Sequence, residues 1–254
     1  MVACHACRSA NSTLEMRFAV VAAIPRAFYG DRGFAHCNGG TMHDISELVD
    51  GYRRFLEGRY PEEAALYRSL AERGQSPKIM IIACCDSRAD PAAIFNASPG
   101  QFFIVRNVAN LVPPFEPHGD YHGTSAALEF AVTELRVETI VVMGHARCGG
   151  IGALLEGRIY EEPGKRGFIG SWMSILQAAR AETLSEVSDG SDEERQQALE
   201  HAGVRQSIEN LQTFPFVRER LSDGSLRLRG AYFDIADGRL LGLDPQSRQF
   251  QPVT

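Results

Sequence analysis

Two short segments, 84–88 and 145–150, carry the residues best suited to chemistry. The first reads Cys-Cys-Asp-Ser-Arg and the second reads His-Ala-Arg-Cys-Gly-Gly. Thiolate sulfur and imidazole nitrogen are ligands that Zn²⁺ binds in tetrahedral sites. Two cysteines and one histidine leave a fourth position open for water, as in catalytic zinc sites, whereas structural sites are usually closed by four protein ligands. The two segments therefore predict one zinc ion per chain, held by three side chains.

The residues leave open which cysteine of the first segment binds the metal. Consecutive side chains at the end of a strand point to opposite sides, so Cys84 and Cys85 should not both face it. The alternative interpretation is a buried thiol pair beside a core histidine without a metal. It is disfavoured because Asp86 and Arg88, a charged pair, directly follow the cysteines.

Both segments directly follow predicted strands. Continuous apolar runs bounded by polar residues are typical of strands buried on both faces, and three such runs occur, at 78–84, 101–106 and 138–143. A helical pattern at 124–136 separates the last two, which indicates a crossover connection and a parallel sheet. Ligand sites in such sheets form at the carboxyl ends of the strands. We therefore expect the two segments to meet at one edge of the sheet.

The whole pattern predicts an α/β fold: a single domain over 42–254, with a mainly parallel central β-sheet flanked by helices and an N-terminal helical arm. The arm is a pair of amphipathic helices from Asp44 to residue 73, the first capped by Asp44 and the second opening at Pro61. Further helices are expected at 168–183 and 191–213, followed by a hairpin of 226–235 and 239–243.

Residues 1–41 lack sustained periodicity. We interpret them as a disordered extension or as a mis-assigned start, because Met42 stands immediately before the first helix. A targeting role stays open, since Arg17 precedes a short apolar run.

Composition excludes several classes of function. A net charge of −6 argues against a nucleic-acid partner, because phosphate binding needs a basic surface. No apolar run approaches the roughly 18 residues needed to span a bilayer, so no membrane partner is expected. The six cysteines do not form a disulfide pattern and fit a metal-binding protein of the cytoplasm.

The order Cys-x-Asp-Ser-Arg, then about sixty residues later His-x-x-Cys-Gly-Gly, resembles the β-class carbonic anhydrases. Segments 106–114 (RNVANLVPP) and 230–235 (GAYFDI) are also similar to that family, and the likeness runs from about 44 to 250. The resemblance implies reversible hydration of CO₂ to bicarbonate and a proton by metal-bound hydroxide. It selects Cys84, with His145 and Cys148, as the zinc ligands.

The resemblance also implies roles for neighbouring residues. Asp86 would accept the proton of the nucleophile in a hydrogen bond and orient it, and Arg88 would clamp Asp86 and keep it ionised. These two are the predicted catalytic residues. The predicted substrate-binding groups are the side chains of Gln75, Phe103 and Val108 and the backbone N–H of Gly149. Gln75 also has a plain turn interpretation, in Gly-Gln-Ser-Pro.

Position 81 indicates the subtype. A branch of the family with an inhibitory bicarbonate site and an aspartate-closed zinc has Trp three residues before the first cysteine ligand, where this chain has Ile81. The resemblance therefore implies the plant-like, open-site subtype. The chain departs from the usual family pattern at Ala89 and at Phe130, which replaces a pocket tyrosine and could alter substrate preference.

The resemblance further implies a homodimer or homotetramer, with the helices at 44–73 wrapping the partner and the active sites near the subunit boundary. Two alternatives remain: a hydrolase of CS₂ or COS on the same scaffold, and a non-catalytic zinc-binding regulator. The intact Asp86 and Arg88 argue against the regulator. Three histidines are candidates for carrying protons to bulk water, and the sequence assigns none of them: His118, His122 and His201.

Overall fold

The computed structural model describes residues 45–118, 122–160 and 167–253. The extension predicted for 1–41 and the proposed cap Asp44 lie outside the described residues. Two helices precede the first strand, as predicted: α1 (Ile45–Glu57) and α2 (Arg59–Arg73). The second begins before Pro61, and its Arg59 guanidinium donates to the Ala97 carbonyl oxygen at 2.6 Å.

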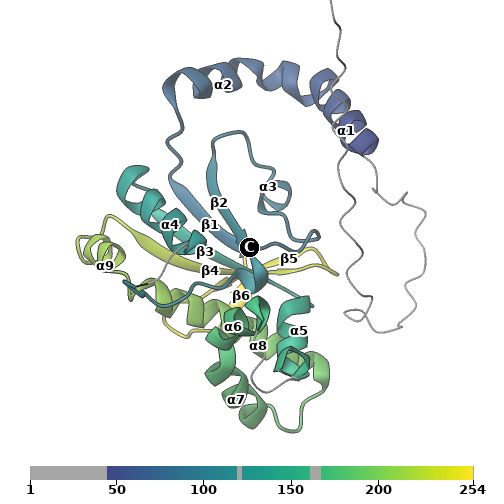
Figure 1. Cartoon of the computed structure of the whole chain (residues 1–254), viewed down its shortest axis with the longest axis vertical. Coiled ribbons are helices and arrows are strands. Elements are labelled where there is room, and N and C mark those ends of the chain that lie inside the picture. Colours follow the sequence, from purple (N-terminus) through teal and green to yellow (C-terminus); the bar gives the residue numbers. More distant parts are fainter. Residues whose placement is uncertain (1–44, 119–121, 161–166, 254) are drawn as a thin grey trace, which may run out of the picture. The chain divides into compact units, whose positions relative to one another are not determined.

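A six-stranded sheet forms the centre of the fold, with the strand order β2-β1-β3-β4-β5-β6 (Figure 1). The strands are β1 (Ile79–Cys84), β2 (Phe102–Asn107), β3 (Thr139–His145), β4 (Arg227–Asp234), β5 (Arg239–Leu243) and β6 (Phe250–Pro252). The first four run parallel and the last two pair antiparallel. The predicted mainly parallel sheet and its C-terminal hairpin are confirmed.

The register of the central strands brings the two chemical segments to one edge. Ala83 of β1 pairs with Met143 of β3, and the strands are parallel. Both strands therefore end at the same edge of the sheet. Cys84 is the last residue of β1, and His145 is the last residue of β3. The third strand ends two residues later than the apolar run indicated, which makes His145 part of the sheet.

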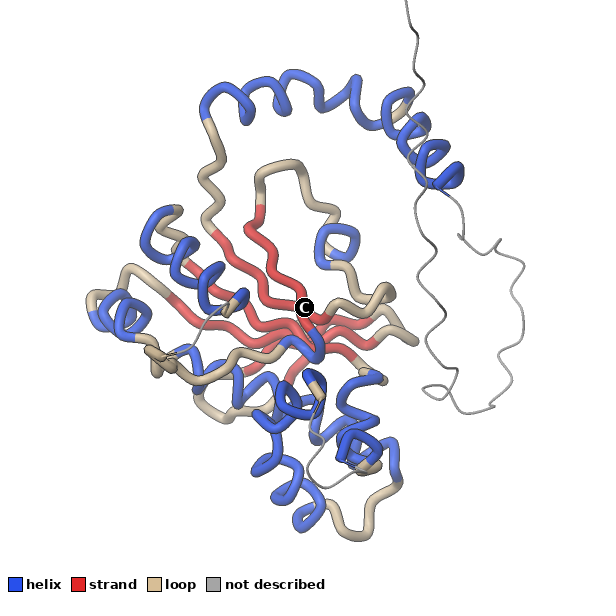
Figure 2. The backbone as a smooth tube through the Cα atoms, in the orientation of Figure 1, coloured by secondary structure: helices blue, strands red, loops and turns tan. Residues whose placement is uncertain are grey.

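Helices cover the sheet on both sides, mainly on the side of α5 to α8 (Figures 1 and 2). The α-helices after β1 are α3 (Pro91–Ile94), α4 (Gly123–Glu129), α5 (Gly149–Leu155), α6 (Phe168–Met173), α7 (Gln177–Glu186), α8 (Asp192–Leu211) and α9 (Pro215–Ser222). The helix predicted at 124–136 is α4 followed by a π-helical turn, and the helix predicted at 168–183 is α6 and α7 with a 3₁₀ turn between them. No described helix combines the length and the apolar character that a membrane crossing requires.

The longest helix, α8, begins at a capping box. Ser191 Oγ accepts from the backbone N–H of Glu194, and the Glu194 carboxylate accepts from the backbone N–H of Ser191 at 2.8 Å. These two bonds satisfy donors that a helix start otherwise leaves free. The buried side of α8 packs on β3 and β4. This helix therefore has a fixed position against β3 and β4, the strands next to the chemical site.

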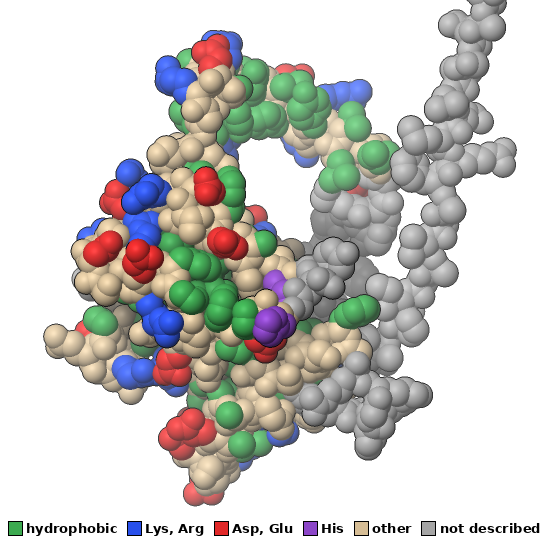
Figure 3. Space-filling view, turned by 60° about the vertical axis from the view of Figure 1, so that its left-hand side comes forward, with side chains coloured by type: hydrophobic (Ala, Val, Ile, Leu, Met, Phe, Trp, Pro, Cys, Tyr) green, Lys and Arg blue, Asp and Glu red, His purple; other side chains and the backbone are tan. Residues whose placement is uncertain are grey.

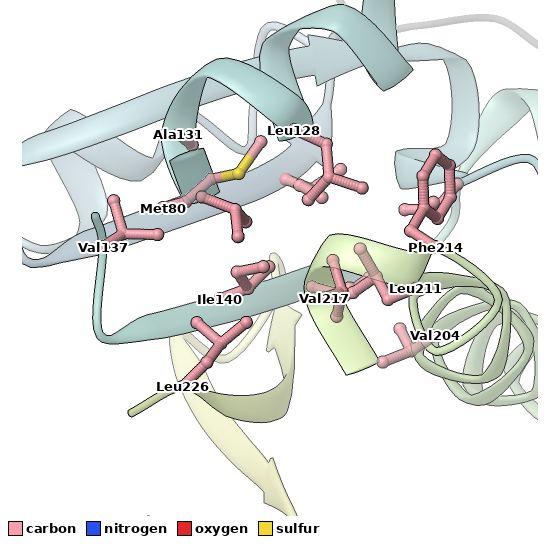
Figure 4. Packing of buried hydrophobic residues seen from close by; sticks show 14 residues of the cluster. Met80, Leu128, Ala131, Val137, Ile140, Val204, Leu211, Phe214, Val217 and Leu226 are labelled. Atoms are coloured by element: carbon pink, nitrogen blue, oxygen red, sulfur yellow. The ribbon is translucent and has the colours of Figure 1, made fainter. Parts of the chain in front are cut away.

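The alternation of side chains along β1 divides the core. Met80 and Ile82 enter a cluster with residues of α4, α8 and α9, and Figure 4 shows Met80 and Ile140 facing Leu128, Val204 and Leu211. The intervening Ile81 and Ala83 enter a cluster on the other face, with Ile94 and Phe95 packed against it. The strand is buried on both faces, as the continuous apolar run predicts.

Gly144, one residue before His145, lets α8 approach β3 closely. A Cβ built at this position would lie 2.7 Å from Val204 Cγ2 and 3.6 Å from Tyr232 Cδ2. Real Cβ contacts are longer than the first of these distances, so a side chain here would force either Val204 or α8 to shift in a packed core.

We predict that Gly144→Ala lowers the free energy of unfolding by roughly 1–3 kcal/mol, the usual cost of overpacking a filled core. Urea denaturation followed by circular dichroism measures it. Gly123→Ala is the matched control, because a Cβ at Gly123 meets nothing within 4 Å and alanine favours the helix that starts there. Equal stability of the Gly144 variant and the wild type would contradict the close contact.

Candidate metal centre

The three predicted ligands converge at the carboxyl edge of the sheet. The ligand atoms of Cys84, His145 and Cys148 all lie within 4.8 Å of one another, and the two sulfurs are 4.0 Å apart. The three residues are 5%, 1% and 1% exposed. Cys85 is exposed, so the alternation of strand side chains separates the two adjacent cysteines and turns Cys84 inward.

The geometry of this group fits a zinc ion. A tetrahedral ion with Zn–S bonds of about 2.3 Å places two sulfurs about 3.8 Å apart. His145 Nδ1 lies 2.9 Å from the Ala146 carbonyl oxygen, so that nitrogen carries the proton and donates it there, and the lone pair is on Nε2. Nε2 is buried and has no hydrogen-bond partner among the described residues. A metal ion between the sulfurs and Nε2 would satisfy it.

Without a metal, the side chains of Cys84, Cys148 and His145 hold protons between them. Cys148 and Cys84 share one: the hydrogen bond from Cys148 lowers the pKa of Cys84 to about 4, and the same bond raises the pKa of Cys148 well above its ordinary value. Burial is the largest single influence and lowers the pKa of His145, but the Cys84 sulfur, the Ala146 carbonyl oxygen and the Asp86 carboxylate together raise that pKa above its ordinary value. Zinc replaces such protons when it binds thiolates and a neutral imidazole.

Asp86 lies beside this group and is held by Arg88 in a bidentate pair. Arg88 Nε donates to Oδ1 at 2.9 Å and Nη2 donates to Oδ2 at 2.7 Å, and the Arg88 backbone N–H donates to Oδ1. The hydrogen bond from the Arg88 side chain, which outweighs partial burial, lowers the pKa of Asp86 to about 2. Oδ2 lies 3.9 Å from His145 Nε2. An ionised carboxylate therefore stands next to the metal position.

The sequence prediction missed Arg106, which fixes the loop that carries Cys84 and Asp86. Its guanidinium donates to the carbonyl oxygens of Cys84 at 2.9 Å and of Asp86 at 2.7 Å, and to the Asp90 carboxylate at 2.9 Å. The feature of the sequence that could have indicated this role is a charged residue at the end of an apolar strand.

The prediction also missed Glu200, a carboxylate on the buried face of α8 that lies next to Cys148. Burial raises the pKa of Glu200.

Two of the four predicted substrate-binding groups lie near the metal group. Val108 packs against the cluster that contains Cys84 and Cys148, and a Cβ at Gly150 would lie 3.0 Å from Val108 Cγ1. Gly149 directly follows Cys148 as the first residue of α5, where backbone N–H groups have no acceptor within the helix.

The other two predicted substrate-binding groups, Phe103 and Gln75, do not lie beside the metal group of their own chain. Phe103 is four residues before Asn107, the partner of Cys84 in the register, so it lies on the order of 13 Å down the strand. Its ring packs on Phe130 with centroids 5.9 Å apart. Gln75 is exposed in the loop before β1. Contact of either residue with a substrate stays a prediction.

The histidines considered as proton carriers differ in burial. His118 and His122 are exposed. His201 packs between Phe250 and Tyr232, with ring centroids 4.2 and 4.5 Å away, and burial lowers its pKa to about 4. A half-buried ring that stays neutral at ordinary pH is a poor carrier of protons to bulk water, and no carrier is assigned.

Comparison with known proteins supports the same kind of site. Residues 79–240 match the family model described as carbonic anhydrase. The chain is 38% identical over 194 residues to "Beta carbonic anhydrase 3" of Arabidopsis thaliana, covering 76% of this chain and 74% of that relative. This plant relative is consistent with the plant-like subtype.

Solved structures give the same result. The β-carbonic anhydrase CcaA superposes with a TM-score of 0.77 at 30% identity, covering 83% of this chain and 92% of that one. Another match, at 28% identity and a TM-score of 0.68, covers 78% of this chain and 96% of a chain described as a tetrameric β-carbonic anhydrase from Sordaria macrospora. The family match and the plant relative cover most of the chain, including the Cys-His-Cys group, and on that evidence the chain belongs to the β-carbonic anhydrase family.

Proposed function

We propose that this protein catalyses the reversible hydration of CO₂ to bicarbonate and a proton, with one zinc ion held by Cys84, His145 and Cys148. The observation that carries the proposal is the buried group at the edge of the sheet: two sulfurs and one imidazole nitrogen that has no hydrogen-bond partner in the described part of the chain. Zinc bound there would act as a Lewis acid and lower the pKa of a water ligand to about 7. The residues around the metal group orient the attacking oxygen and bind CO₂.

Asp86 orients the attacking oxygen. Because the ionised carboxylate only accepts hydrogen bonds, it would accept one from the hydrogen of the attacking oxygen and leave a lone pair of that oxygen free to face carbon. The bidentate bond from Arg88 fixes the plane of the carboxylate, and the Arg88 guanidinium is itself anchored to the Arg147 carbonyl oxygen at 3.1 Å. The same clamp would keep the Asp86 carboxylate from binding a zinc ion held by Cys84, His145 and Cys148.

CO₂ is apolar and has two acceptor oxygens, so its site needs apolar walls and few donors. Val108 supplies an apolar wall beside the metal group, and the Gly149 N–H supplies a donor. Trp172 Nε1 donates to the Val108 carbonyl oxygen at 2.8 Å and holds that wall in place.

We propose further that the chain forms a homodimer or homotetramer. Helix α1 exposes Ile45, Leu48 and Tyr52, at 73%, 60% and 58%. Phe130, beside Phe103, is 47% exposed. Figure 3 shows hydrophobic side chains gathered on the face of the molecule that is in view. A partner subunit would cover such apolar surface. Gln75 precedes the start of β1 and Phe103 lies near the start of β2, whereas Cys84 is the last residue of β1. Any contact of these two residues with substrate would therefore be made across a subunit boundary.

A reducing compartment keeps the three described thiols free for metal binding, so we propose the cytoplasm as the location.

We predict that the purified protein contains one zinc per chain and that Cys84→Ser removes most of it, because the hydroxyl is a poor replacement for a thiolate. Cys85→Ser is the matched control: the adjacent, exposed cysteine should be dispensable. Elemental analysis of the purified proteins measures the metal. Loss of zinc in the Cys85 variant, with zinc retained in the Cys84 variant, would reverse the ligand assignment.

We predict that Asp86→Asn lowers the rate of CO₂ hydration by roughly 10- to 100-fold, the usual effect of losing a residue that orients a metal-site group, while zinc content is kept. Stopped-flow hydration with a pH indicator measures the rate. Asp192→Asn, which changes an exposed carboxylate at the start of α8, should be silent.

Two results of the same series would contradict the proposal. Negligible rates in both the wild type and the Asp86 variant would favour a zinc-binding regulator. Faster turnover of CS₂ or COS than of CO₂, measured in parallel, would favour a hydrolase of those substrates.

We predict an oligomer in analytical ultracentrifugation at micromolar concentration, and a shift toward smaller species in Leu48→Asp, because a charge on the apolar face of α1 opposes burial. Asp50→Ala, which changes an exposed carboxylate of the same helix, serves as the control. A wild-type protein that sediments as a monomer would contradict the proposed assembly.

A further inference from the structure

Helix α8 holds the backbone of one metal ligand on both sides. The Cys148 N–H donates to Glu200 Oε1 at 2.8 Å, and Gln196 Nε2 donates to the Cys148 carbonyl oxygen at 3.2 Å. The two α8 residues are also bonded to each other, since Gln196 Nε2 donates to Glu200 Oε1 at 2.9 Å. They lie 48 and 52 residues after Cys148, so only tertiary packing brings them there.

Glu200 is itself fixed from a third element. The Tyr232 hydroxyl of β4 donates to Glu200 Oε2 at 2.6 Å, so both carboxylate oxygens are engaged. The residue is 2% exposed. Burying a carboxylate is costly unless hydrogen bonds compensate it, and here three donors converge on it. Such an arrangement stiffens α8, β4 and the start of α5 into one unit.

The position of Cys148 explains what this unit does for the metal centre. Cys148 is the N-cap of α5, with φ −66° and ψ 118°, and its side chain makes no capping hydrogen bond. In a capping box, a glutamate three residues later accepts from the N-cap backbone N–H. In this chain position 151 is Ile, and Glu200 of another helix accepts that bond instead. The sulfur is left free to face Cys84.

We propose that Glu200 is a positioning residue of the metal centre: by accepting the backbone N–H of Cys148, it fixes the direction in which that sulfur points toward Cys84 and His145. The inference rests on the proposed zinc site and concerns only how one ligand is held. Glu200 touches neither the three ligand atoms nor the substrate in this role.

Zinc affinity and a spectroscopic signature test the role directly. Glu200→Ala should weaken zinc binding by roughly 10- to 100-fold in competition with a chromophoric chelator, since residues that orient metal ligands have effects of that size. The same variant loaded with Co²⁺ should show altered sulfur-to-metal and ligand-field bands. Glu200→Gln should stay close to wild type in both measurements, because an amide oxygen can accept from Cys148 and Gln196 while its NH₂ donates to the Tyr232 oxygen.

Glu209→Gln is the matched control, on the same helix but paired with Arg248 at the surface. If Glu200→Ala does not fold by circular dichroism, Gln196→Ala carries the test, because it removes only the amide that bridges Glu200 and the Cys148 carbonyl; it should weaken zinc binding in the same direction.

Several results would overturn the role. Wild-type zinc affinity and an unchanged Co²⁺ spectrum in Glu200→Ala, or in Gln196→Ala where that variant replaces it, would do so. So would a Glu200→Gln variant as weak as Glu200→Ala, since charge rather than position would then be the cause. These results leave the proposed function intact, whereas a wild-type protein that binds no zinc would overturn both.

Discussion

The parallel alignment of β1 and β3 is the constraint on which the site depends. Ala83 pairs with Met143 in a parallel register, so Cys84 and His145 emerge at the same edge and on neighbouring strands. An antiparallel pair would send the two ends to opposite edges of the sheet. The turn after His145 then needs only three more residues to bring the sulfur of Cys148 within 4.0 Å of the sulfur of Cys84.

Burial makes this arrangement a metal site rather than a group of polar side chains. Two thiols and an imidazole share a volume that water scarcely reaches. In that volume the two thiols cannot both be ionised unless a cation lies beside them. The surrounding residues pair the charged and polar groups next to the site. Arg88 neutralises Asp86, Arg106 holds the carbonyl oxygens of the Cys84 loop, and the carboxylate of Glu200 accepts a backbone N–H rather than facing the metal.

The sequence predicted those parts of the fold that depend on local pattern. Apolar runs identified the buried strands, helical spacing identified α8, and ligand chemistry identified His145 and Cys148. The choice between Cys84 and Cys85 required the family resemblance, because alternation separates them without saying which side faces the metal. Helix α5 was missed because it opens with Gly149-Gly150, and β6 because three residues carry no periodicity. The contacts of Arg106 and Glu200 could not be predicted, since packing joins segments far apart in the chain.

The coordination of the metal is the most direct test of this account. X-ray absorption at the zinc edge of the purified protein should show two sulfur ligands at about 2.3 Å and two nitrogen or oxygen ligands at about 2.0 Å, the latter being one imidazole and one water. Spectra with four sulfurs, or with none, would contradict a site built from Cys84, His145 and Cys148.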